Sequence, residues 1–384
     1  MDAALAEHLP HLRRAQRQGL VLWVYGAILA QSACQNAVIT ALRAYGRWHT
    51  LRQALREWLA DGVERAAPCR TQVEVAACFA PLLRWVVRWW QGDTLPLAID
   101  ATTLGDRLVV LAVSVLYRGS AIPVAWAVLP APGRGPWLPD LTALLTILRP
   151  AVPSSLRVLV MTDRGLWSPT LWDTIIACGW HPLMRLRGET TVQPAGPRRQ
   201  PARRLIPGPG HAWLGPAVVF KEARKRRTGT LLVVWAAGHQ DVWILLTTLP
   251  PAAVGAGLYG GRMWIELGFR VLKSFGWQWQ QTQRTDPRRV ARHWLVLAVA
   301  TLWTLAAGTW AADQEAADLG LPPTQRHLPP PPPAVARPRR ASVFRVGRAW
   351  LLQTLMEGGM WPPLRLIPTA LPQPPPALQM TVVH

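Results

Sequence analysis

Short apolar segments separated by turns, between residues 95 and 186, constrain the fold most. Apolar runs of this length are typical of buried strands, and Ser168 followed by Pro169 is typical of a helix start. In chain order we expect strands at 95–100, 107–117 and 121–129, a helix at 139–148, a strand at 156–163, a helix at 168–178 and a strand at 182–186. The first and fourth of these strands each end in an acid, Asp100 and Asp163.

Three meandering strands, a helix, a strand, a helix and a strand are the element order of the ribonuclease-H-like α/β fold. In that order the first and fourth strands are neighbours at the centre of the sheet, so Asp100 and Asp163 are expected to lie close together. We assign this ribonuclease-H-like domain to residues 93–312, with a β-rich insertion at about 188–250 that includes strands at 231–236 and 242–246. A helical domain precedes it at 1–92. This domain is a candidate for DNA binding, although it shows no helix-turn-helix spacing. A proline-rich linker and basic tail follow at 313–384.

Further patterns predict the surroundings of this domain. The apolar run at 20–42 is expected to form a core helix. The run at 294–312 has no charge over 19 residues, which is close to membrane-spanning length, but its threonines and the basic run before it favour a helix buried in the protein. In the tail we expect an extended linker around 329–333, a helix at 343–356, and disorder in the last residues, including 372–376.

The stretch 259–273 places polar side chains at helical intervals. Tyr259, Arg262, Glu266 and Lys273 fall within about 60° of one another on a helix, and Arg270 lies just beyond that arc. Apolar residues occupy the opposite face: Trp264, Ile265, Leu267, Val271 and Leu272. An ordinary amphipathic helix with a solvated face is the alternative interpretation. A lone carboxylate among cations and a phenol suits a metal ion beside a phosphate.

Three carboxylates are candidates for one metal site: Asp100, Asp163 and Glu266. A carboxylate at the end of an apolar strand is costly unless it is paired or bound to a metal. Oxygen ligands of this kind suit Mg²⁺ or Mn²⁺, and two such ions beside a phosphodiester would activate the attacking hydroxyl and stabilise the leaving oxygen. Taken singly, each aspartate could instead cap a turn, with Thr102 and Arg164 as local partners. The trio, together with the element order, favours the metal site.

The charge of the chain indicates a polyanionic partner. Its formal net charge is +21, which favours nucleic acid first and an anionic membrane surface second. Almost all of this charge is arginine, because the sequence has only three lysines, so Lys273 carries more weight than any one arginine. The four cysteines show no zinc-ligand spacing and the N-terminus shows no signal-peptide pattern, so we expect reduced thiols in a cytoplasmic protein.

At these residues the chain resembles the bacterial insertion-sequence transposases of the DDE type, in the cut-and-paste branch marked by the signature Y-x2-R-x3-E-x6-K. The residues that match the signature at every spacing are Tyr259, Arg262, Glu266 and Lys273. The segments around Asp100 and Asp163 look like the first and second acidic motifs of that family. The resemblance covers about residues 95 to 312.

The resemblance implies two-metal cleavage of double-stranded DNA at the terminal repeats of the element, followed by strand transfer into target DNA. It implies that Asp100, Asp163 and Glu266 are catalytic and bind two Mg²⁺ or Mn²⁺ ions, and that Tyr259, Arg262 and Lys273 hold DNA phosphates. It also implies a homodimer in the DNA complex and no membrane partner.

Some features depart from the family or leave alternatives. Some relatives place an aromatic of the insertion against a flipped base, which Trp235 or Trp243 could do here, although packing in the core is the ordinary role of such residues. The tail after residue 313 lacks a long dimerisation helix. A domesticated DNA-binding protein that no longer cleaves, or a structure-directed nuclease with the same fold, are the alternative functions.

Overall fold

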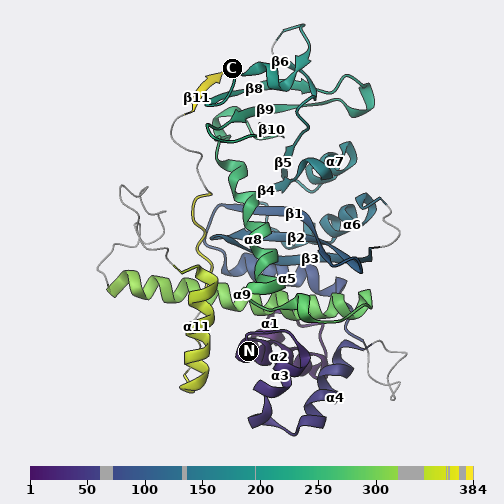
Figure 1. Ribbon diagram of the computed structural model, residues 1–384, viewed down its shortest axis with the longest axis vertical. Helices are drawn as coiled ribbons and strands as arrows, with labels where there is room; N and C mark the ends of the chain where they lie inside the picture. The colour runs from purple at the N-terminus through teal and green to yellow at the C-terminus, as the bar shows by residue number, and fades with distance from the viewer. Residues whose placement is uncertain are drawn as a thin grey trace.

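The structure, a computed structural model, describes residues 1–60, 72–131, 136–194, 196–318, 341–359, 361, 364–371 and 378–383. One large mixed sheet runs through the molecule, with helices around it (Figure 1). Its strand order is β3-β2-β1-β4-β5-β10-β9-β8-β6-β7, and β11 also pairs with β8. The strands are β1 (Thr94–Leu104), β2 (Leu108–Tyr117), β3 (Ser120–Pro130), β4 (Arg157–Thr162), β5 (His181–Arg185), β6 (Thr191–Pro194), β7 (Gln200–Pro201), β8 (His211–Val219), β9 (Arg227–Trp235), β10 (Trp243–Thr247) and β11 (Gln379–Val382).

The first five strands have the order and the connections that the sequence predicts. β1, β2 and β3 form an antiparallel meander, and β4 and β5 are parallel to β1 and to each other. The turn between β2 and β3 consists of Arg118 and Gly119, both with positive φ (45° and 82°), as a tight two-residue hairpin requires. The parallel pairing of β1 with β4 ends at Ile99 opposite Thr162, directly before the two aspartates.

The segment predicted as a β-rich insertion continues the same sheet. β10 pairs antiparallel with β5, and β9 and β8 follow in turn. The two strands expected at 231–236 and 242–246 correspond to β9 and β10. β8 was not predicted, because Gly215 and Pro216 interrupt its apolar pattern, yet both residues pair with β9.

Helices cover the sheet and extend below it in Figure 1. They are α1 (Asp2–His8), α2 (Arg14–Ala30), α3 (Gln35–Ala41), α4 (Trp48–Leu59), α5 (Ala76–Trp89), α6 (Leu138–Leu148), α7 (Pro169–Ala177), α8 (Met263–Arg270), α9 (Pro287–Asp318) and α11 (Val343–Met356). α6 contacts α5 and α7, whereas α8 contacts β1, β2 and β3 (Figure 1). Ser168 caps α7 as predicted, because its hydroxyl accepts a hydrogen bond from the Leu171 amide.

The N-terminal residues are helical, as predicted, but the core helix expected at 20–42 is wrong. Two helices, α2 and α3, occupy this run, and the chain turns between them where Gln31 adopts a left-handed conformation (φ 50°). The polar residues Gln31 and Ser32 provide the break in an otherwise apolar stretch. α5 contacts β3, so the last helix of this region packs on the sheet itself.

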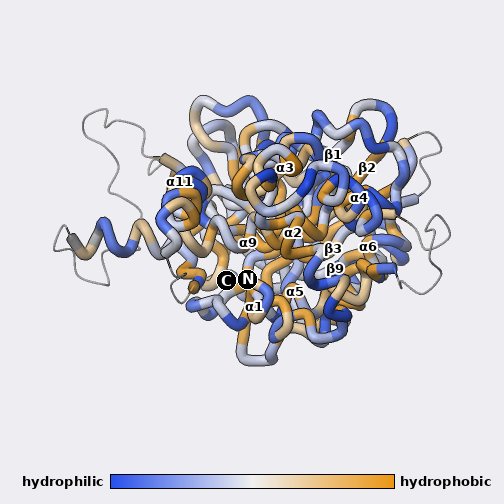
Figure 2. Tube along the Cα trace, turned by 90° about the horizontal axis from the view of Figure 1, so that it is seen from below, coloured by the Kyte–Doolittle hydropathy of each residue, from blue (hydrophilic) through white to orange (hydrophobic). Residues whose placement is uncertain are grey.

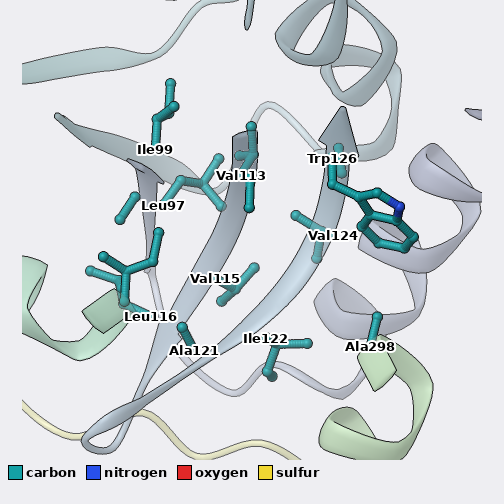
Figure 3. Packing of buried hydrophobic residues seen from close by; sticks show 14 of the residues in the cluster. Leu97, Ile99, Val113, Val115, Leu116, Ala121, Ile122, Val124, Trp126 and Ala298 are labelled. Atoms are coloured by element: carbon teal, nitrogen blue, oxygen red, sulfur yellow. The ribbon is translucent and has the colours of Figure 1, made fainter. Parts of the chain in front are cut away.

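α9 is a long central helix that packs against both the N-terminal helices and the sheet. It contacts β3, α2, α4 and α11 (Figure 1). In the described part of the chain, one helix, Pro287–Glu315, is long and apolar enough to cross a membrane, but 83% of its most apolar 18-residue window is buried. Figure 2 shows hydrophobic chain gathered at the centre around α2 and α9, with hydrophilic segments outside. In Figure 3, Ile122 of β3 lies beside Ala298 of α9. The predicted buried helix is therefore confirmed.

The C-terminal part is ordered where the structure describes it. α11 has the predicted bounds and crosses α9 where Gly308 meets Gly347, so closely that a Cβ on Gly347 would strike the Thr304 carbonyl. The predicted disorder of the last residues is wrong for 378–383, since β11 adds to the edge of β8. The predicted linker at 329–333 and the proline run at 372–376 lie outside the described residues.

Candidate active site

Asp100 lies on β1, and Asp163 lies at the end of β4, the parallel strand beside it. Asp163 directly follows β4, as predicted, and its Oδ1 accepts a hydrogen bond of 2.6 Å from the Arg164 amide. Asp100 does not end its strand, contrary to the prediction, because β1 continues to Leu104 in its hairpin with β2. It is the parallel neighbour β4 that stops, and this leaves the Asp100 carboxylate at the open edge beside Asp163.

The signature segment is not one continuous α-helix, which corrects the prediction. Residues Leu258–Arg262 form a 3₁₀ turn, α8 follows, and Val271–Phe275 form a π-helical turn. Gly260 and Gly261 weaken the helical preference at the start. Ile265 and Leu272 are buried as expected from the apolar face, but Leu267 is 38% exposed.

Arg262 joins the three predicted carboxylates. Its Nη2 donates to Asp100 Oδ2 at 2.8 Å and lies 3.9 Å from Asp163 Oδ2. Its Nη1 donates to Glu266 Oε1 at 2.7 Å. The side chain is 10% exposed. The structure thus brings Asp100, Asp163, Arg262 and Glu266 together from β1, the end of β4 and the start of α8.

Tyr259 fastens the start of the signature segment to β4. Its hydroxyl donates a hydrogen bond of 3.0 Å to the Thr162 carbonyl, next to Asp163, and burial raises its pKa. The ring packs edge-on against Trp243, with 5.4 Å between centroids. Trp243 is therefore half-buried behind the signature segment, whereas the Trp235 indole donates to the His239 carbonyl in its own turn. Apart from strand periodicity, nothing in the sequence predicts the contacts that Thr162 and Trp243 make with Tyr259.

Lys273 and Arg270 lie farther along the segment. Lys273 is half-buried in the π-helical turn, and burial lowers its pKa. In the described part of the chain no ion pair joins Lys273 to a carboxylate. Arg270 is exposed on the last turn of α8. Among the described residues, neither cation forms an ion pair with the three carboxylates.

Burial and charge act in opposite directions on Asp100. Burial raises its pKa above the ordinary value of 3.8, the Arg262 guanidinium lowers it, and the Asp163 and Glu266 carboxylates raise it again. Like charges this close disfavour joint ionisation unless a cation compensates them. In this structure Arg262 provides that compensation.

The donor set has the chemistry of a divalent-cation site. Carboxylate oxygens are the ligands that Mg²⁺ and Mn²⁺ prefer, and three of them face one point. Among the residues that the structure describes, no group of three or more His, Cys, Asp or Glu side chains is close enough to hold one ion. The guanidinium between the carboxylates keeps them apart, so the residues fit the ions in kind but not in their present spacing.

One family model matches the middle of the chain. Residues 132–303 match the family model described as the transposase DDE domain. The match supports a DDE transposase. It includes Asp163, Glu266 and the other signature residues, and begins after Asp100.

A solved structure and the curated proteins were also compared. The cryo-EM structure of the piggyBac transposase synaptic complex with hairpin DNA is similar at 10% identity and a TM-score of 0.43, over 92% of this chain and 77% of that chain. No curated protein matches the chain. The mixed α/β architecture with one large sheet is that expected of a DDE domain.

Proposed function

We propose that the chain is an insertion-sequence transposase that cleaves double-stranded DNA at the ends of its element and joins them to target DNA. The observation that carries the proposal is the convergence of Asp100, Asp163 and Glu266 on one guanidinium inside a chain that matches the transposase DDE domain. Three carboxylates from distant segments rarely share one point for structural reasons alone, because their mutual repulsion costs stability.

The strand order supports a ribonuclease-H-like core within this proposal. β1 to β3 form an antiparallel meander, β4 and β5 are added in parallel, and the first two acids lie at the β1–β4 boundary. The spacing of the signature residues supports the Y-x2-R-x3-E-x6-K branch of insertion-sequence transposases.

The proposed chemistry needs two divalent ions, Mg²⁺ or Mn²⁺. Asp100, Asp163 and Glu266 would hold them, and bound ions of this kind activate the attacking hydroxyl and stabilise the leaving oxygen of a phosphodiester. The fold of the chain positions these three carboxylates. β1 and β4 fix two carboxylates on the rigid sheet, and α8 brings the third across its face.

The cations of the signature are proposed to hold DNA. Lys273 and Arg262 carry the charges that recognise phosphates, and Tyr259 contributes by fixing the segment to β4. The net charge of +21 supports a polyanionic partner, namely the terminal repeats and the target DNA. The resemblance also implies a homodimer. We include it in the proposal, with two copies of the chain acting on paired ends.

The domesticated DNA-binding protein is the second candidate. It would keep the fold and the basic surface but would not cut DNA. The three intact carboxylates favour the active enzyme, because a chain that no longer cleaves gains nothing from a costly acidic cluster. The signature spacing and the β-rich insertion favour a transposase over a structure-directed nuclease of the same fold.

The test is cleavage of DNA that carries the element's ends by the full chain in Mg²⁺. We expect the wild type to cut at the ends and Glu266→Ala to bind the same DNA without cutting it. Glu189→Ala, which removes an exposed carboxylate on the loop after β5, is the control and should cut normally. Cleavage that persists in Glu266→Ala would refute the role of Glu266, and a wild type that binds cognate ends without cutting them would favour the domesticated protein.

A further inference from the structure

Arg262 uses its terminal nitrogens on the carboxylates that are proposed to hold the ions. Nη2 contacts Asp100 at 2.8 Å and Nη1 contacts Glu266 at 2.7 Å, while Asp163 completes the group at 3.9 Å. Its Nε is buried without a hydrogen-bond partner. The guanidinium is therefore held by these carboxylates and by no other acceptor from the described residues.

This arrangement cannot coexist with a phosphate contact or with a shared ion. A charge-assisted bond of 2.7–2.8 Å occupies the oxygens Asp100 Oδ2 and Glu266 Oε1, which face the centre of the group. A Mg²⁺ or Mn²⁺ ion binds its ligands at about 2.1 Å and needs the carboxylates closer to one another than a guanidinium between them permits. Two cations this close together would also repel each other.

We propose that Arg262 is a positioning residue that neutralises and orders Asp100, Asp163 and Glu266 before the ions bind, and that it must leave them when the ions enter. The guanidinium that is released would then be free for a DNA phosphate. This inference rests on the proposed function, since it concerns the same carboxylates.

The opposite role makes a different prediction. If Arg262 stayed in place and merely held the carboxylates in the geometry that the ions need, its removal would weaken metal binding. If Arg262 competes with the ions, its removal strengthens metal binding. The two roles therefore differ in the sign of one measurable quantity, the affinity for a divalent ion in the absence of DNA.

The experiment is calorimetric titration of the full chain with Mn²⁺ at pH 8, without DNA. Because the competing contacts are charge-assisted, we expect Arg262→Gln to lower the Kd for Mn²⁺ about tenfold or more. Arg56→Gln makes the same change of charge on the exposed face of α4, in the N-terminal region, and should leave the Kd unchanged. A Kd in Arg262→Gln that equals or exceeds that of the wild type would overturn the inference.

Thermal unfolding provides a second readout that also monitors folding. In EDTA, Arg262→Gln should unfold at a lower temperature than the wild type, because three carboxylates then lack a counter-cation. Added Ca²⁺ should raise the Tm of Arg262→Gln more than that of the wild type and close the deficit. A deficit that Ca²⁺ does not reduce would contradict the inference.

Asp100→Asn separates failure of the inference from failure of the proposed function. Loss of Mn²⁺ binding in Asp100→Asn, with no change in Arg262→Gln, would overturn the role of Arg262 alone. A wild type whose Mn²⁺ binding is absent, or is unaffected by Asp100→Asn, would overturn the metal site and the proposed function with it.

Discussion

At the scale of single residues, Asp100 is a carboxylate whose charged form is disfavoured by burial. It lies on β1 where the neighbouring strand β4 has just ended, and the hairpin with β2 holds it there whether or not a cation is present. Burial raises its pKa, and Arg262 only partly offsets this. The folded state therefore binds the Asp100 proton more tightly than the unfolded state does.

This difference predicts how stability changes with pH. Because the pKa of Asp100 is raised in the folded state, the titration of Asp100 lowers stability as pH rises from about 3.8 through the raised pKa, and this contribution is fully lost above it. Asp100→Asn has no such proton. We therefore compare the free energy of unfolding of Asp100→Asn with that of the wild type in metal-free buffer. The difference, variant minus wild type, should grow with pH over this window and then level off. Urea titrations at a series of pH values measure it. A difference that shrinks as pH rises would contradict the prediction.

Tyr259 is the second residue whose role can be measured. Tyr259→Phe keeps the ring against Trp243 but removes the donor to the buried Thr162 carbonyl, which should cost about 1–3 kcal/mol in the free energy of unfolding. Tyr45→Phe, which removes an exposed hydroxyl bonded to Tyr25, is the control and should cost less. Equal costs in urea unfolding would argue against a positioning role for the Tyr259 hydroxyl.

At the scale of elements, the distance between α8 and the sheet sets the position of Glu266. Gly268 lies two residues after Glu266, over the start of β3, where a Cβ would come within 2.7 Å of the Ala121 Cβ and 3.0 Å of the Ala121 amide nitrogen. The missing side chain lets the helix lie directly on the strand. The close seat of α8 on β3 thereby fixes the height at which Glu266, on the other side of the helix, lies above the sheet.

Gly268→Ala should lift α8 from β3. Overpacking of this kind typically costs about 1–3 kcal/mol of stability, and a catalytic group displaced by about 1 Å can lose about a hundredfold in rate. We expect both losses, measured by urea unfolding and by cleavage of end DNA in Mg²⁺. Gly208→Ala, made where a Cβ has open space, is the control. A Gly268→Ala enzyme with wild-type cleavage would show that the close approach of α8 is not needed.

Elements with regular apolar periodicity could be predicted from the sequence, and those interrupted by special residues could not. The strands from β1 to β5 and the bounds of α11 follow from such periodicity. The prediction failed at Gln31, where the chain turns in the left-handed conformation, and at Gly260, where a 3₁₀ turn replaces the α-helix. β11 was missed because its pairing depends on the distant β8 rather than on its own pattern.

The candidate site was predictable as a set of residues but not as a set of contacts. The spacing of Arg262 and Glu266 on a helix indicates that they are near each other, and the aspartates at adjacent strands indicate a cluster. That Arg262 turns inward to Asp100, 162 residues earlier in the chain, depends on how closely α8 packs on the sheet. Tertiary packing of this kind leaves no local pattern in the sequence.

At the scale of the whole molecule, one sheet connects the edge that carries the candidate site to the β-rich segment, and the chain is strongly basic. The chain has 42 Lys and Arg residues against 21 Asp and Glu residues, and three of these acids are gathered around Arg262. Such a charge distribution favours binding to a polyanion through many phosphate contacts.

DNA binding should therefore depend steeply on salt. If the chain neutralises several phosphates, its affinity for end DNA should fall by about 10³–10⁵ between about 50 and 200 mM salt, with a linear log–log slope. Fluorescence anisotropy in EDTA measures this without cleavage. Lys273→Gln should make this log–log slope shallower by about one, because one phosphate contact is lost. An affinity that hardly changes with salt would contradict the proposed mode of binding.

The central claim, that Asp163 and its two partners hold the ions that cut DNA, is tested most directly by changing the ligand chemistry. A thiolate is a poor ligand for Mg²⁺ but a better one for the softer Mn²⁺. The measurement is the cleavage rate of Asp163→Cys on end DNA in each metal, beside Asp163→Ala. We predict no cleavage by Asp163→Cys in Mg²⁺, partial recovery in Mn²⁺, and no cleavage by Asp163→Ala in either. Cleavage by Asp163→Cys or Asp163→Ala in Mg²⁺ at the wild-type rate would contradict the claim.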